Sequence, residues 1–144
     1  MPSSRRLEDI TRDRAEQTAK ECGRHFDRIT VKSEVTEDLG LVTVLQDGYI
    51  VSKEFVETDG SLGRPHRMSE YARILLGKAR LVVAVPEARA VDVWLKMREL
   101  NRFWLFYYQL YYYDDEGRLH LLDRAEWRRL RGLPPERTWC PEVA

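Results

Sequence analysis

Long hydrophobic runs, cysteine and histidine are all scarce in this chain of 144 residues. No apolar run approaches the roughly 20 residues that a membrane-spanning helix needs, and the first residues lack the apolar segment of a signal peptide. We therefore expect a cytoplasmic protein without a membrane partner. Two cysteines, Cys22 and Cys140, are too few for a disulfide framework, and the sequence leaves open whether they pair.

Net charge is absent as well, because 24 basic residues balance 24 acidic ones. This composition does not indicate a globally basic nucleic-acid binder, so any such partner must meet a local patch. Arginine outnumbers lysine, which is compatible with the surface ion-pair networks of heat-adapted proteins and suggests a thermophilic source.

The length of the chain matches one ordinary domain, and we expect a single domain over residues 1–144 because no linker or repeat divides it. The patterns predict α/β structure with a central mixed sheet flanked by helices. The expected elements are a helix over 5–28, a strand over 29–35, two strands about Asp47-Gly48, a loop over 58–66, a helix ending near 77, a buried strand over 79–86, a helix from 86 to about 100, strands over 103–113 and 118–122, and a helix capped by Asp123.

The predicted strand over 103–113 contains eight aromatic residues in eleven positions. Aromatic residues favour strands and cores, and they also form the stacking surfaces of nucleic-acid binders. In a strand, Tyr108 and Tyr112 share one face, and Tyr107, Tyr111 and Tyr113 share the other. We expect one row to be buried, and the other row is available as a stacking surface or as the seam of a homodimer.

The order of these elements resembles the core of the PD-(D/E)XK nuclease superfamily, the restriction-endonuclease-like fold that includes archaeal Holliday junction resolvases. The likeness spans residues 15–122, and its most recognisable part is the segment YARILLGKARLVVAVPEARAVDVWLKM. In that family an Asp and a Glu on successive strands bind a divalent metal, and a Lys two residues beyond the Glu helps to activate water. The resemblance implies a metal-dependent phosphodiesterase that acts on DNA with Mg²⁺ or Mn²⁺.

Carried onto this sequence, the resemblance makes Asp38 and Glu54 the metal ligands, but Val56 stands where the Lys is expected. Lys53 and Arg67 are the candidate replacement cations. Glu16 matches the acidic residue that the family often has on its first helix, as a further metal ligand.

The length of the turn at Asp47-Gly48 decides which acids share a face. A two-residue turn places Asp38 opposite Glu57, with Lys53 on the same face, whereas a three-residue loop places Glu54 on the face of Asp38. Both acid pairs remain open on the sequence, and the resemblance favours Asp38 with Glu54.

Two functions follow from these observations. The first is the nuclease, and the second is a catalytically inactive member of the fold that binds nucleic acid or assembles with protein, which the missing Lys supports. The only locally basic segment is the last helix, which could contact DNA phosphates or be a salt-bridged terminal helix. Its candidate phosphate contacts are Arg124, Arg128, Arg129 and Arg131.

Overall fold

The computed structural model describes residues 3–24, 27–100 and 108–135. In chain order the described elements are α1 (Ser3–Gly23), β1 (Ile29–Thr36), β2 (Leu39–Gln46), β3 (Tyr49–Val56), α2 (Asp59–Leu62), α3 (Arg67–Leu76), β4 (Arg80–Pro86), the 3-10 helix η1 (Glu87–Arg89), α4 (Ala90–Leu100), β5 (Tyr108–Tyr113), β6 (Leu119–Leu121) and α5 (Arg124–Leu130). The predicted succession of helices and strands is confirmed for these residues, except that α2 occupies part of the segment expected to be a loop.

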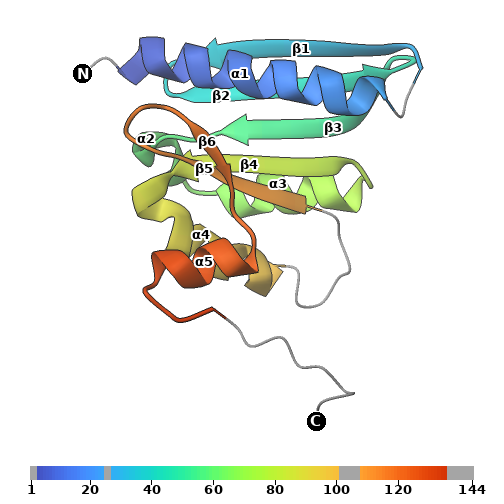
Figure 1. Cartoon of the computed structure of the whole chain (residues 1–144). Coiled ribbons are helices and arrows are strands. Elements are labelled where there is room, and N and C mark those ends of the chain that lie inside the picture. Colours follow the sequence, from blue (N-terminus) through green and yellow to red (C-terminus); the bar gives the residue numbers. More distant parts are fainter. Residues whose placement is uncertain (1–2, 25–26, 101–107, 136–144) are drawn as a thin grey trace.

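The strands form one six-stranded mixed sheet in the order β1-β2-β3-β4-β5-β6 (Figure 1). β1, β2 and β3 are an antiparallel meander, β3, β4 and β5 run parallel, and β6 pairs antiparallel with β5. The continuous apolar run that predicted a strand covered on both faces is β4, in which residues 81–85 are all buried. The expected α/β class is therefore confirmed, while the identity of this core with the restriction-endonuclease-like fold stays a prediction.

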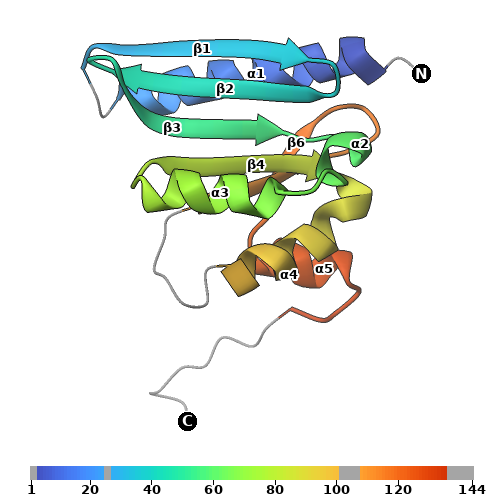
Figure 2. The same cartoon turned by 180° about the vertical axis from the view of Figure 1, so that it is seen from behind.

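Helices cover the two faces of the sheet unequally. α1 lies on one face, across the antiparallel strands, and α3 lies on the other (Figures 1 and 2). The larger core joins α3, α4 and α5 to the second face and contains Phe55, Tyr71, Leu75, Leu81, Val83, Val85, Ala90, Val93, Met97, Leu110, Tyr112, Leu122 and Trp127. The smaller core, beneath α1, contains Leu7, Ile10, Val56 and Ala84.

The buried stripe of α1 includes polar residues that hydrophobic periodicity does not reveal. Among its buried members are Leu7, Thr11, Arg14, Thr18 and Cys22, which recur at the spacing of three to four residues that one helical face requires. Thr11 contacts β2 so closely that a Cβ at Gly40 would lie 1.9 Å from the Thr11 Oγ1 atom. Only glycine fits at position 40, and this close approach sets polar side chains of α1 directly on the sheet.

The tyrosine-rich strand β5 is an inner strand of the sheet, paired with β4 on one side and β6 on the other. Tyr112 is buried in the larger core, and Tyr111 and Tyr113 pack beneath α1. The expected alternation of the tyrosines is confirmed, and the row of Tyr111 and Tyr113 is half-buried. A stacking surface or homodimer seam on this row stays a prediction. The part of the aromatic run over 101–107, including Tyr107, lies outside the described residues.

Across residues 3–24, 27–100 and 108–135, no helix is both long enough and apolar enough to cross a lipid bilayer. Cys22 is buried in α1 with a free thiol, and Cys140 lies outside the described residues.

Candidate functional site

Asp38, the first predicted metal ligand, lies in the two-residue connection between β1 and β2. Its carboxylate forms an ion pair with Arg64, which comes from the segment between α2 and α3. The Asp38 carbonyl oxygen accepts a hydrogen bond of 2.8 Å from Thr58 Oγ1. These contacts connect the β1–β2 turn to the chain that follows β3.

Glu54, the second predicted ligand, is fully buried in β3 beneath α1. Arg14 Nε lies 2.5 Å from Glu54 Oε1, and Thr18 Oγ1 donates a hydrogen bond to Oε2. Arg80 Nη2, from the neighbouring strand β4, lies 3.8 Å from the same Oε2. Both carboxylate oxygens are therefore engaged by basic or hydroxyl groups of α1 and β4.

Arg14 is as deeply buried as the carboxylate that it meets. It also donates to Thr18 Oγ1 at 3.0 Å and to Glu21 Oε2 at 3.5 Å, and its guanidinium carbon lies 4.4 Å from the centre of the Tyr111 ring. Burial alone would lower the pKa of Arg14, but the Glu54 carboxylate outweighs it and the pKa is raised. Arg14 therefore keeps its positive charge inside the protein.

The register of β2 and β3 combines the two alternatives that the sequence left open. The turn has two residues, because Gln46 pairs with Tyr49, and both Asp47 and Gly48 have positive φ, as in a type I′ turn. An irregularity between Val44 and Leu45 then shifts the register by one residue. Consequently Val42 pairs with Glu54. The Glu54 side chain therefore lies on the same face of the hairpin as Asp38, which was expected only for a three-residue loop.

Asp38 and Glu54 share one face of the hairpin, but they do not lie close together. Asp38 lies four positions beyond Val42, the residue opposite Glu54, and this corresponds to roughly 13 Å along a strand. Each acid is also held by its own arginine, Asp38 by Arg64 and Glu54 by Arg14.

Glu57, the alternative acid, lies on the opposite face of the sheet and is also fully buried. Arg67 Nη2 donates to Glu57 Oε1 at 3.0 Å, and Arg67 Nε lies 2.7 Å from Oε2, although its N–H is not aimed well enough to count as a hydrogen bond. Ser61 Oγ donates to Oε1 at 2.6 Å, and the Tyr71 hydroxyl donates to Oε2. Burial and then the Glu57 charge raise the pKa of Tyr71, which keeps this hydroxyl protonated as a donor.

The remaining residues of the predicted centre are dispersed. Glu16 is exposed on α1, next to but not on the buried stripe. Lys53 donates to Thr43 Oγ1 at 2.9 Å, and it neighbours Glu54 on a regular part of the strand, so the two side chains leave on opposite faces. Arg67 serves Glu57 rather than an acid of the Asp38 side.

These residues do not fit a Mg²⁺ or Mn²⁺ centre of the kind predicted. Such a centre needs carboxylate oxygens that converge and that are free to bind the cation. Here the acids are separated along the strands or across the sheet, and arginines already neutralise them. In the described part of the chain, no group of three or more histidine, cysteine, aspartate or glutamate side chains could hold a metal ion.

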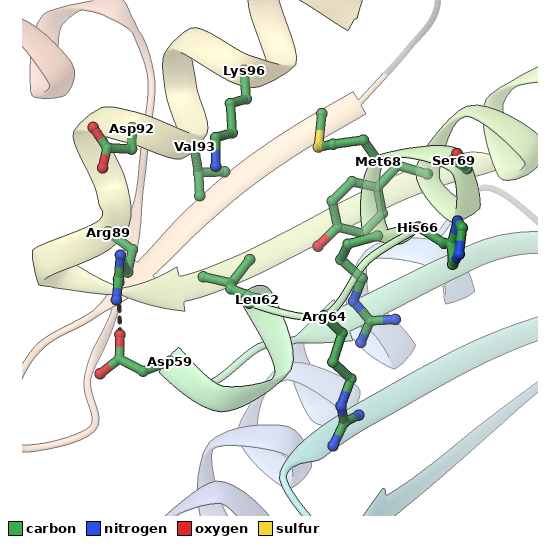
Figure 3. Close-up of a pocket in the computed structure, with 13 residues that line it drawn as sticks. Asp59, Leu62, Arg64, His66, Met68, Ser69, Arg89, Asp92, Val93 and Lys96 are labelled. Atoms are coloured by element: carbon green, nitrogen blue, oxygen red, sulfur yellow. Dashed lines mark hydrogen bonds and ion pairs between the residues drawn. The ribbon is translucent and has the colours of Figure 1, made fainter.

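A pocket of about 350 Å³ opens at the carboxyl end of the parallel strands β3 and β4 (Figure 3). It lies between α2, the first turn of α3 and the start of α4, which are the segments that follow the carboxyl ends of β3 and β4. Ligands of open α/β sheets bind outside these strand ends. The lining residues are Asp59, Leu62, Gly63, Arg64, His66, Arg67, Met68, Ser69, Tyr71, Arg89, Asp92, Val93 and Lys96.

The charged side chains of the pocket are mostly basic. Arg89 Nε lies 2.8 Å from Asp59 Oδ1 across the mouth, and Arg64 and Arg67 bind acids outside the lining. Lys96 is exposed, and no ion pair connects it to another described residue. Sequence reasoning identified Arg67 but missed Lys96 and Arg89, and the signal that could have found them is their position just after the apolar strand β4.

Comparison with protein-family models, with curated proteins and with solved structures found no match. The chemistry of this chain must therefore be inferred from its own residues.

The arginines predicted to contact phosphate lie on or beside α5. Arg129 donates to Glu126 at 2.7 Å and to the Tyr112 hydroxyl at 3.2 Å, and Arg131 lies over the ring of Trp127. Arg128 donates to the carbonyl oxygen of Pro134, and Arg124 also has a partner. The basic helix is therefore connected to its surroundings by several intramolecular contacts, and a role in binding DNA stays a prediction.

Proposed function

We propose that this chain binds nucleic acid without cleaving it, and that the pocket between α2, α3 and α4 holds a phosphate group of the strand. The observation that carries this proposal is the gathering of basic side chains at the carboxyl end of β3 and β4. The engagement of Asp38, Glu54 and Glu57 by arginines supports the non-catalytic part of the proposal.

The pocket presents basic side chains to an anionic ligand. Its lining has four basic side chains, from Arg64, Arg67, Arg89 and Lys96, against the two acidic ones of Asp59 and Asp92. Arg64, Arg67 and Arg89 form ion pairs with Asp38, Glu57 and Asp59, respectively. Among the described residues of the lining, Lys96 is the basic side chain that no ion pair occupies. Phosphate is the anion that basic side chains bind most commonly in nucleic-acid complexes.

The backbone supports the same class of ligand. α3 is ten residues long, and its first turn lines the pocket. His66, at its N-cap, makes no side-chain hydrogen bond to the helix. Backbone N–H groups at such a terminus, together with the helix dipole, favour an anion. In this arrangement Lys96 contributes charge, and the helix contributes directed donors.

Binding is tested by fluorescence anisotropy with labelled single-stranded, duplex and branched DNA over a range of salt concentrations. We expect binding that weakens with salt, and we expect Lys96→Ala to weaken it and to reduce the salt slope by about 1. Lys20→Ala is the matched control, because Lys20 is exposed on α1, which covers the other face of the sheet. Equal effects of the two substitutions, or no binding by the wild type, would contradict the proposal.

Catalysis is tested with the same DNA molecules in the presence of Mg²⁺ or Mn²⁺. We expect no cleavage and no metal-dependent increase in the melting temperature, because the acids are not available to a cation. Metal-dependent cleavage that disappears in Asp38→Ala would establish the nuclease instead.

A further inference from the structure

Among the described strands, β1 forms one edge of the sheet and pairs with β2 alone. It is eight residues long, and most of its side chains are exposed. A long edge strand offers a row of unpaired backbone groups to another chain. Neither proline nor a bulge interrupts β1, two devices by which proteins protect such an edge.

The register of the β1–β2 hairpin shows which backbone groups of β1 are unpaired. Thr36 pairs with Leu39 across a two-residue connection, and residues that flank such a connection bond to each other. Bonded and non-bonded positions alternate along an antiparallel strand. The N–H and C=O groups of Val31, Ser33 and Val35 therefore point away from β2, toward the free edge.

The sequence of this edge is complementary to itself. When the sequence is read outward from Ser33 in both directions, Lys32 corresponds to Glu34, Val31 to Val35 and Thr30 to Thr36. An antiparallel pair of such strands matches a cation with an anion at two places, β-branched residues with β-branched residues at four places, and Ser33 with itself at the centre. The position of Ser33 also fits, because it is one of the residues whose backbone groups face outward.

We propose that two copies of this chain form a dimer by antiparallel pairing of their β1 strands about Ser33. The outward backbone groups of Val31, Ser33 and Val35 bond to those of Val35, Ser33 and Val31 in the second copy. Lys32 then lies opposite Glu34 in a non-bonded pair, where cross-strand side chains are closest. Both copies use the same strand in this two-fold interface, so no free β1 edge remains and the assembly stops at the dimer.

Within the described ranges of the chain, the charged pairs of this interface have no competing ion-pair partner. Lys32 and Glu34 are exposed, and no ion pair joins either of them to another described residue. Both line a shallow hollow with Leu41, Thr43 and Leu45 on the face of the meander opposite α1. Pairing of two copies would bring the charges together at the margin of this hollow.

Charge reversal tests the proposal. Sedimentation equilibrium of the wild type should show a monomer–dimer equilibrium, and Lys32→Glu or Glu34→Lys should each weaken it at least about tenfold by placing like charges opposite each other. The double substitution Lys32→Glu with Glu34→Lys restores complementarity and should restore the dimer. A wild type that stays monomeric at its highest soluble concentration, or single variants that dimerise normally, would overturn the proposal.

A second pair of variants separates loss of the dimer from loss of the fold. Ser33→Pro removes an N–H group that points to the free edge, so the hairpin should survive while the dimer is lost. Ser33→Ala keeps the N–H group and should dimerise like the wild type. Circular dichroism verifies the fold of both variants. A folded Ser33→Pro variant that still forms dimers would place the contact elsewhere and overturn the proposal.

Discussion

At the scale of the residue, three arginines define the character of the candidate centre. Arg14, Arg64 and Arg67 hold Glu54, Asp38 and Glu57, respectively. A buried carboxylate that is paired in this way is a structural charge, and removal of its partner leaves an uncompensated ion in the interior. The same acidic residues that suggest a metal site in the sequence therefore contribute to holding the fold together.

We predict that Arg14→Met lowers the free energy of unfolding by about 3–5 kcal/mol, because Glu54 stays buried without its counter-charge. Urea denaturation measures this change. The matched control is Arg12→Met, which removes the exposed pair of Arg12 with Asp9 and should cost less than about 1 kcal/mol. The role assigned to Arg14 is wrong if both variants lose the same stability.

These arginine contacts could not be predicted from the sequence. Charged residues on a helix usually face water, so hydrophobic periodicity does not indicate that Arg14 is buried. The spacing of Leu7, Thr11, Arg14 and Thr18 contains the signal, but it becomes visible only if polar residues are allowed on the buried face. The partners Glu54 and Arg14 are forty positions apart, and only the fold brings them together.

At the scale of the element, periodicity and turn residues were sufficient for most of the secondary structure. The Asp47-Gly48 turn, the buried strand β4 and the cap of α5 at Asp123 were all predicted, and Asp123 Oδ1 accepts a hydrogen bond from Glu126 N. The irregularity near Val44 has no turn residue to signal it. Because one extra residue reverses the parity of a strand, this single feature decided which face Glu54 occupies.

The contact of α5 with β5 predicts a dependence of stability on pH. A hydrogen bond from Arg129 lowers the pKa of Glu126 to about 2, although burial opposes this effect and Tyr112 supports it. The ionised carboxylate therefore stabilises the folded state above its ordinary pKa of 4.5, and this contribution is lost as the pH falls toward 2. Glu126→Gln should show a shallower loss of stability over this range than the wild type.

Chemical denaturation at a series of pH values measures this difference. Glu16→Gln, in an exposed part of α1, is the control and should follow the wild-type profile. Parallel curves for Glu126→Gln and the wild type would show that the pair with Arg129 does not contribute.

At the scale of the whole molecule, helices cover the two faces of the sheet unequally, and the two proposed binding surfaces lie at different margins of the sheet. α1 covers one face, and the larger core fills the other beneath α3, α4 and α5. The proposed phosphate pocket lies at the ends of the parallel strands, and the proposed dimer edge lies on the antiparallel side, at β1. The two surfaces are separate, so binding of nucleic acid and pairing of two copies can be tested independently.

Cys22 provides a probe of opening of the α1 layer. It is 4% exposed, and burial raises the pKa of its thiol, although Arg80 opposes this effect. We predict that in a Cys140→Ser background alkylation is slow and that its rate rises with urea in parallel with unfolding. Rapid alkylation in the absence of denaturant would show that α1 leaves the sheet without global unfolding.

Glu54 on β3 and Glu57, the residue directly after this strand, are three positions apart, and their side chains leave the backbone on opposite faces of the sheet. One carboxylate thus lies on each side of the sheet, and the helix on that side contributes the arginine that pairs with it: Arg14 from α1 and Arg67 from α3. A truncated chain that began at β1 would leave Glu54 without the cation and hydroxyl of α1. The first helix is therefore an integral part of the domain and not a detachable arm.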